Sequence, residues 1–122
     1  MIKVFGLAKR KPGMSFEEFS AYYRERHAKL GETVLKRVGA VHYKRNYVVP
    51  AANQFHGEPQ ESDFDVVVEF WFPDMASFEA CFDIVGNEMR DTFIEDELNF
   101  AERDSIRMLM VVEEDESDMT AQ

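Results

Sequence analysis

The chain has 122 residues, a length that fits one domain with a single hydrophobic core. Its hydrophobic content of 45 %, with eleven Phe residues, supplies enough apolar surface for such a core. The formal net charge of −10 argues against nucleic acid as a partner, because phosphate binding depends on clustered Lys and Arg.

Much of the acidic excess lies at the C-terminus, where five carboxylates occur within residues 113–118. We therefore divide the chain into a folded domain over residues 1–112 and an acidic tail over residues 113–122 that is expected to be disordered. The net charge does not exclude an anionic ligand, because a pocket needs only a few local bases, such as Lys9, Arg10 or Lys44.

The sequence favours a reduced, cytoplasmic compartment without membrane attachment. Cys81 is the only cysteine, so an intrachain disulfide is impossible. Residues 1–9 are too short and too charged for a signal peptide, and no apolar run approaches the roughly 18 residues of a membrane span.

The first part of the chain predicts a strand, a turn and a helix. Residues 2–9 are apolar and lead into Lys-Arg-Lys-Pro-Gly at residues 9–13, where Pro and Gly indicate a turn. Ser15 and Glu18 then have capping-box spacing, so a helix should begin here. At about 100° per residue, one stripe of this helix contains Phe16, Phe19, Tyr23, His27, Leu30 and Val34.

The rest of the chain predicts three strands and further helix. Strands are expected at residues 41–49, 64–72 and 106–112, with a polar loop at 51–63. A second helix should open at residues 73–74, and a short helical stretch is expected at 91–102. The stripe of the second helix contains Phe78, Cys81, Phe82, Val85 and Met89.

The resulting order, β-α-β-β-α-β, is typical of the α+β ferredoxin-like fold, a four-stranded antiparallel sheet with two helices on one face. In a lone protomer, Trp71 and several apolar side chains on the other face of the sheet would be exposed to water. We therefore expect a homodimer in which a partner sheet covers that face.

The N-terminal part of the sequence resembles the signature of the EthD family. The similarity lies in residues 4–19, Val-Phe-Gly-Leu-Ala-Lys-Arg-Lys-Pro-Gly-Met-Ser-Phe-Glu-Glu-Phe, followed by Tyr22-Tyr23 and Arg26-His27-Ala28. The later predicted elements agree with this family in type and length through residue 112. The resemblance implies a dimeric α+β barrel with a ligand pocket between helices and sheet in each protomer.

The functions of similar proteins are diverse, and the fold alone does not choose among them. They include cofactor-independent decarboxylases, dehydratases and cyclases of aromatic polyketides, lactone isomerases, and an accessory protein of an ether-degrading cytochrome P450 system. We expect a cofactor-independent lyase or isomerase that decarboxylates, dehydrates or cyclises a small aromatic or polyketide-derived compound, such as an acid. The alternatives are a non-catalytic small-molecule-binding accessory protein of an oxidative degradation pathway and a cofactor-free oxygenase of a phenolic substrate.

His27 is the first candidate catalytic residue. Imidazole is the side chain best suited to proton transfer near neutral pH, and the helix stripe should turn His27 toward the pocket as a general acid/base. It also matches the helix His of the EthD family. The alternative interpretation is a buried histidine satisfied by a backbone group or a Tyr hydroxyl.

Tyr43 is the second predicted catalytic residue, because it resembles an aromatic residue near the ligand of similar lactone isomerases. It shares a face of its strand with Tyr47, whereas His42 points to the other side. The predicted substrate-binding residues are Tyr23, Tyr47, His56 and Trp71. Filling the core or the dimer interface is at least an equal alternative for Tyr43 and Tyr47, and a solvated surface position is the alternative for His56.

The sequence contains no motif for a metal or a nucleotide cofactor. The three histidines lie on a helix, a strand and a loop, without the local spacing of a metal site. Phosphate-binding, dinucleotide-binding and serine-hydrolase motifs do not occur. We therefore expect no metal and no cofactor, with a small aromatic ligand as the partner of the pocket.

Overall fold

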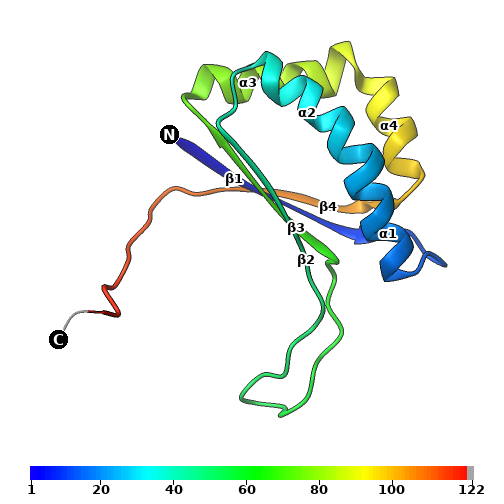
Figure 1. Cartoon of the computed structure of the whole chain (residues 1–122), viewed down its shortest axis with the longest axis vertical. Coiled ribbons are helices and arrows are strands. Elements are labelled where there is room, and N and C mark those ends of the chain that lie inside the picture. Colours follow the sequence, from blue (N-terminus) through cyan, green and yellow to red (C-terminus); the bar gives the residue numbers. More distant parts are fainter. Residues whose placement is uncertain (121–122) are drawn as a thin grey trace.

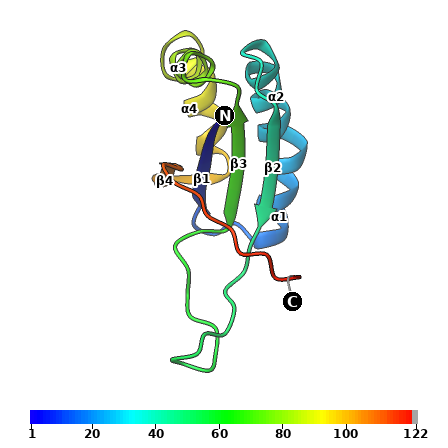
Figure 2. The ribbon, with the colours of Figure 1, turned by 90° about the vertical axis from the view of Figure 1, so that its left-hand side faces the viewer.

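A computed structural model describes residues 1–120 and has the predicted ferredoxin-like α+β fold (Figure 1, Figure 2). Its four-stranded antiparallel sheet has the order β2-β3-β1-β4. The strands are β1 (Ile2–Arg10), β2 (His42–Tyr47), β3 (Val66–Phe72) and β4 (Ala101–Met110).

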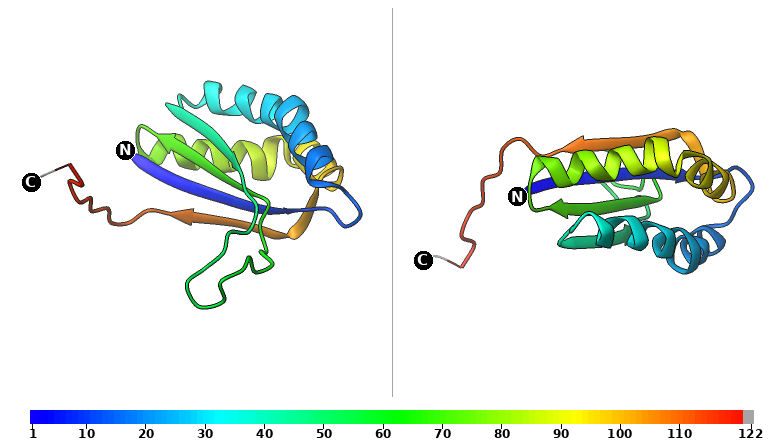
Figure 3. Two further views of the ribbon diagram at one scale, coloured as in Figure 1. Left: turned by 60° about the horizontal axis from the view of Figure 1, so that its bottom comes forward. Right: turned by 90° about the horizontal axis from the view of Figure 1, so that it is seen from above.

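Two helical segments lie side by side on one face of this sheet (Figure 3). The first consists of α1 (Phe16–Tyr22), a π-helical turn η1 (Tyr23–His27) and α2 (Ala28–Arg37). The second consists of α3 (Met75–Asp83), a π-helical turn η2 (Ile84–Glu88) and α4 (Arg90–Leu98). Within residues 1–120, no helix has the length and apolar character that crossing a membrane requires.

The predicted start of the first helix is confirmed. The Ser15 hydroxyl accepts a hydrogen bond from the Glu18 amide at 3.1 Å, and the Glu18 carboxylate accepts one from the Ser15 amide at 3.0 Å. Gly13, with φ of 83°, supplies the left-handed conformation that the preceding turn requires. The chain therefore leaves β1 and enters α1 in a direction fixed by local hydrogen bonds.

The π-helical turn η1 shifts the sheet-facing side of the helix that follows it. The Ala28 amide bonds to the Tyr23 carbonyl, five residues back, so this turn holds one residue more than an α-helical turn. Beyond it, Gly31 and Leu35 line the space above the sheet. Leu35 is only 6 % exposed, although the regular stripe predicted from the sequence omitted it.

The core lies between the helices and the sheet, with Val4, Val66, Val68 and Phe72 buried on the helix-facing side. On the opposite face, Trp71 stacks on His42 with ring centroids 4.4 Å apart. Both side chains therefore lie away from the helices, as the alternation of strand residues requires.

Two predicted boundaries near the C-terminus were wrong. Strand β4 begins at Ala101 rather than at residue 106, and α4 ends at Leu98 rather than at 102. Polar residues at positions 102–105 concealed this part of the strand, which pairs with β1 through Arg10 and Ala101 across an irregular register. Buried Phe100 ends the connection and anchors it in the core.

The segments outside these elements lie at the edges of the molecule. The connection between β2 and β3 projects beyond the sheet as a long loop (Figure 1). After β4, residues 111–118 form neither helix nor strand. Residues 121 and 122 of the predicted tail lie outside the described part of the chain.

Candidate functional site

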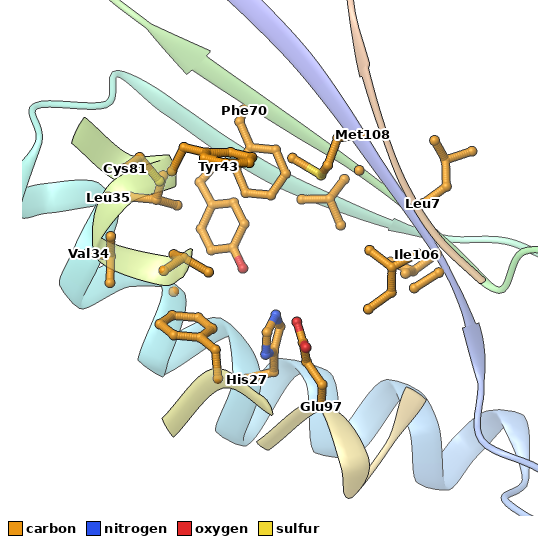
Figure 4. A pocket seen from close by; sticks show the side chains of 18 of the residues that line it. Leu7, His27, Val34, Leu35, Tyr43, Phe70, Cys81, Glu97, Ile106 and Met108 are labelled. Atoms are coloured by element: carbon orange, nitrogen blue, oxygen red, sulfur yellow. The ribbon is translucent and has the colours of Figure 1, made fainter. Parts of the chain in front are cut away.

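A cavity of about 250 Å³ lies between the two helical segments and the sheet. Its wall is mainly aliphatic and aromatic (Figure 4). The sheet contributes Gly6, Val68, Phe70 and Met108, and the helices contribute Val34, Leu35, Cys81, Val85 and Phe93. The volume of the cavity is slightly below the range of ordinary ligand pockets. Its size and apolar lining therefore suit a small ring compound.

Gly6 makes room for two of these side chains. A Cβ atom at this position would lie 3.0 Å from a ring carbon of Phe70 and 3.2 Å from the sulfur of Met108. The missing side chain therefore lets both residues lie over β1 as the sheet side of the cavity.

Four side chains bring oxygen or nitrogen atoms to the cavity wall. They are Tyr23 and His27 from η1, Tyr43 from β2 and Glu97 from α4. The imidazole of His27, the carboxylate of Glu97 and the hydroxyl of Tyr43 point toward the same part of the cavity (Figure 4). No Lys or Arg occurs among the described residues that line it. Lys9, Arg10 and Lys44, considered above as local bases, lie outside the wall.

The imidazole of His27 is held by Asp96. Its Nδ1 atom lies 2.7 Å from Oδ2 of Asp96, and each of the two side chains is 14 % exposed. A carboxylate can only accept a hydrogen bond, so Nδ1 must carry the proton. In the neutral ring, Nε2 is then the atom with a free electron pair, and it is available to the cavity as a base.

Asp96 is itself fixed by Tyr22, whose hydroxyl donates to Oδ1 at 2.7 Å and accepts from the Asn99 amide at 3.0 Å. Burial alone would raise the pKa of Asp96, but the hydrogen bonds from His27 and Tyr22 outweigh burial, so its pKa lies below the usual value. Asp96 therefore stays charged near neutral pH and keeps His27 in one tautomer and orientation.

The two phenols at the cavity are hydrogen-bond donors. Burial raises the pKa of Tyr43 to about 12, although the Arg45 guanidinium, 4.6 Å from the ring centroid, opposes this shift. Burial likewise holds the pKa of Tyr23 well above its usual range. Both hydroxyls therefore remain protonated at neutral pH. Tyr23 donates a hydrogen bond to the Tyr43 hydroxyl, which leaves the proton of Tyr43 to stabilise negative charge on a ligand oxygen.

Glu97 has a different environment from its neighbour Asp96. Its Oε1 atom accepts a hydrogen bond from Nε of Arg103 at 3.1 Å, and its side chain is 19 % exposed. The two adjacent carboxylates of α4 thus lie in different places: Asp96 contacts Nδ1 of His27, and Glu97 lies at the cavity wall.

Of the residues predicted from the sequence, the structure brings Tyr23, His27 and Tyr43 together at the cavity. Tyr47 does not line it; this ring packs against Tyr23, with centroids 6.0 Å apart, and its buried hydroxyl lacks a partner among the described residues.

The other two predicted binding residues also lie away from the cavity. Trp71 is on the far face of the sheet, where Lys3 Nζ lies 4.5 Å from its ring centroid. His56 is exposed in the long loop, where its amide donates to Asn53. Neither residue lines the cavity around His27.

Asp96 and Glu97 were missed by the sequence analysis. Asp96 reaches His27 across 69 positions of sequence, and a pairing at this distance leaves no local signal. Among residues 1–120, no cluster of three or more His, Cys, Asp or Glu side chains suits a metal ion.

The fold and the site define a small α+β protein with an apolar cavity and a carboxylate-held histidine in its wall. Residues 11–104 match the EthD domain, so the chain belongs to the EthD family.

Solved structures that are similar to the chain include two EthD proteins. An EthD-like protein from Ralstonia eutropha JMP134 is 22 % identical with a TM-score of 0.59, and the match covers 90 % of this chain and 86 % of that one. An ethyl tert-butyl ether D (EthD) family protein from Bacillus halodurans C-125 is 19 % identical with a TM-score of 0.63, over 93 % of this chain and 99 % of that one. No curated protein shows significant similarity to the chain.

Proposed function

We propose that the protein is a cofactor-independent lyase or isomerase that transfers a proton within a small aromatic or polyketide-derived compound. The observation that carries this proposal is the hydrogen bond between His27 and Asp96 at the wall of an apolar cavity. It leaves Nε2 of His27 as a base beside a bound ligand.

The chemistry requires few groups. Nε2 of His27 removes a proton from a carbon next to a ligand carbonyl, while the Tyr43 hydroxyl donates to the carbonyl oxygen and stabilises the enolate. The protonated imidazole then returns the proton to another carbon, which is an isomerisation, or gives it to a departing hydroxide, which leaves as water. A positioned acid/base of this kind contributes roughly 10²- to 10⁴-fold to a rate.

A panel of ring ketones, hydroxyketones and aromatic acids, followed by mass spectrometry of the recovered compounds, tests the proposal. Loss of water or carbon dioxide, or a rearranged product of equal mass, is expected with the wild-type protein and not with His27→Ala. A folded His27→Ala variant that turns over as fast as the wild type would refute the assigned role.

A non-catalytic accessory protein that binds a small molecule is the second candidate. It is favoured by the predominance of apolar side chains around the cavity, which bind a ring without reacting with it. In the same panel, tight binding with every compound recovered unchanged would support this function.

We further propose that the protein is a cytoplasmic homodimer. The outer sheet face carries partly exposed Phe5, Leu7, Val67 and Trp71, and Leu109 on β4 is 56 % exposed. A second copy would cover these side chains. Light scattering at micromolar concentration tests this assembly, and the mass of a monomer would refute it. The free thiol of Cys81 is compatible with a reducing compartment.

A further inference from the structure

Glu97 places a second negative charge at the cavity, beside His27. Its Oε1 atom is occupied by Arg103, and no hydrogen bond from another described residue reaches Oε2. Figure 4 shows the carboxylate pointing into the cavity next to the imidazole. Oε2 is therefore an acceptor that is available to a ligand.

The charges around this acceptor do not suit an anionic ligand. Asp96 and Glu97 are both acidic, and Arg103 is the cation paired with Glu97, whereas Asp96 is paired with His27. The group is negative when His27 is neutral and carries no net charge when His27 is protonated. Apart from the two tyrosine hydroxyls, the remaining wall is apolar and contains no Lys or Arg, so a bound carboxylate would lose its hydration without gaining the ion pair that one of these side chains would provide.

A neutral ligand with a hydroxyl group meets no such penalty. Its hydroxyl can donate to Oε2 of Glu97, its ring can pack against the Phe-rich wall, and a carbonyl can accept from Tyr43. Hydrogen bonds to a charged acceptor are stronger than those between neutral groups, so Glu97 favours ligands that carry a donor.

We infer that the cavity selects neutral, hydroxylated ring compounds over carboxylic acids, and that Glu97 is the residue that determines this specificity. The inference rests on the proposed function in taking this cavity as the substrate site. It favours dehydration or isomerisation over decarboxylation, whose substrate carries a carboxylate. It also departs from the acid substrate expected from the sequence.

The test compares 2-naphthol, which is uncharged at pH 7, with the similarly shaped anion 2-naphthoate. Calorimetry on the full chain is expected to give about tenfold or more tighter binding of 2-naphthol. In Glu97→Gln, which keeps the size of the side chain and removes its charge, the preference should fall below about threefold, mainly because 2-naphthoate binds better. Thermal melting of each variant checks that it is folded.

Two further variants make the experiment specific. Glu95→Gln removes a charge from an exposed position of the same helix and should leave the preference unchanged. Arg103→Gln removes the cation that pairs with Glu97 and should increase the preference for 2-naphthol.

Three results would overturn the inference: equal binding of the two compounds, no binding of 2-naphthol up to its solubility limit, or an unchanged preference in folded Glu97→Gln. The measurement needs no turnover. The protein could prefer 2-naphthol through Glu97 and yet transform no compound of the panel. This result would refute the proposed chemistry but support the inferred specificity.

Discussion

Asn has nearly the same shape as Asp, so replacing Asp96 by Asn should misorient His27 with little other change in the structure. The hydrogen bond from His27 Nδ1 ends on a charged oxygen at 2.7 Å. Such bonds contribute about 1.5–3 kcal/mol, against about 1 kcal/mol between neutral groups, so we expect Asp96→Asn to lower the free energy of unfolding by about 1–2 kcal/mol. For a domain of this size, that corresponds to a fall in Tm of roughly 3–10 °C.

The effect of Asp96→Asn should depend on pH in a defined direction. The pKa of Asp96 is lowered in the folded protein, so its contribution to stability is complete above the usual aspartate pKa of about 4 and is lost as the pH falls through the lower folded-state pKa. The difference in Tm between wild type and variant should therefore be full at about pH 7 and smaller at about pH 3.

Circular dichroism melts at both pH values, with nitrogen NMR of the imidazole, measure these effects. The wild type should show the Nδ1-protonated tautomer of His27 whenever the ring is neutral. Asp91→Asn is the control, because the Asp91 side chain on the same helix is fully exposed. Equal Tm values of wild type and Asp96→Asn at pH 7, or a neutral His27 ring protonated at Nε2 instead of Nδ1 in the wild type, would refute the reasoning.

Three smaller perturbations test other parts of the structure. In Gly31→Ala, the new Cβ would lie 3.0 Å from the Tyr43 hydroxyl. Moving the Tyr43 ring off its rotamer costs roughly 0.5–1.5 kcal/mol, so the affinity for 2-naphthol should fall about two- to tenfold. Unchanged affinity would argue against the contact. Burial raises the pKa of the Cys81 thiol in the cavity wall, so alkylation of this thiol by N-ethylmaleimide should be slow. Bound 2-naphthol should slow the alkylation further. An unchanged alkylation rate at saturating 2-naphthol would show that the ligand binds elsewhere. Ser15→Ala removes the cap of α1 and should cost about 1 kcal/mol in urea denaturation, whereas Ser117→Ala, in the exposed tail, should cost nothing measurable.

The parts of the fold that local sequence determines were predictable. Ser15 and Glu18 define the start of α1 by direct hydrogen bonds, and the alternation around Phe72 and Trp71 assigns the two faces of β3. The inward direction of His27 also follows, because only one stripe of the first helix is apolar.

The parts that depend on tertiary contacts were not predictable. The π-helical turn η1 changes the helix phase without any Pro or Gly to signal it, so Leu35 was missed. The partner of His27 comes from α4, whose sequence shows only an ordinary acidic helix. The positions of Trp71 and Tyr47 outside the cavity wall were not predictable either, because aromatic character alone does not show which rings border a cavity.

The central claim, that His27 moves a proton in the cavity, is tested most directly by deuterium exchange into 2-tetralone, a neutral ring ketone with acidic hydrogens next to its carbonyl. In heavy water, NMR should show that the wild-type protein accelerates exchange at these carbons well beyond the rate in buffer alone. With folded His27→Ala, the exchange rate should equal the rate in buffer alone. Equal exchange rates with wild type and His27→Ala, or no acceleration by the wild type, would contradict the account.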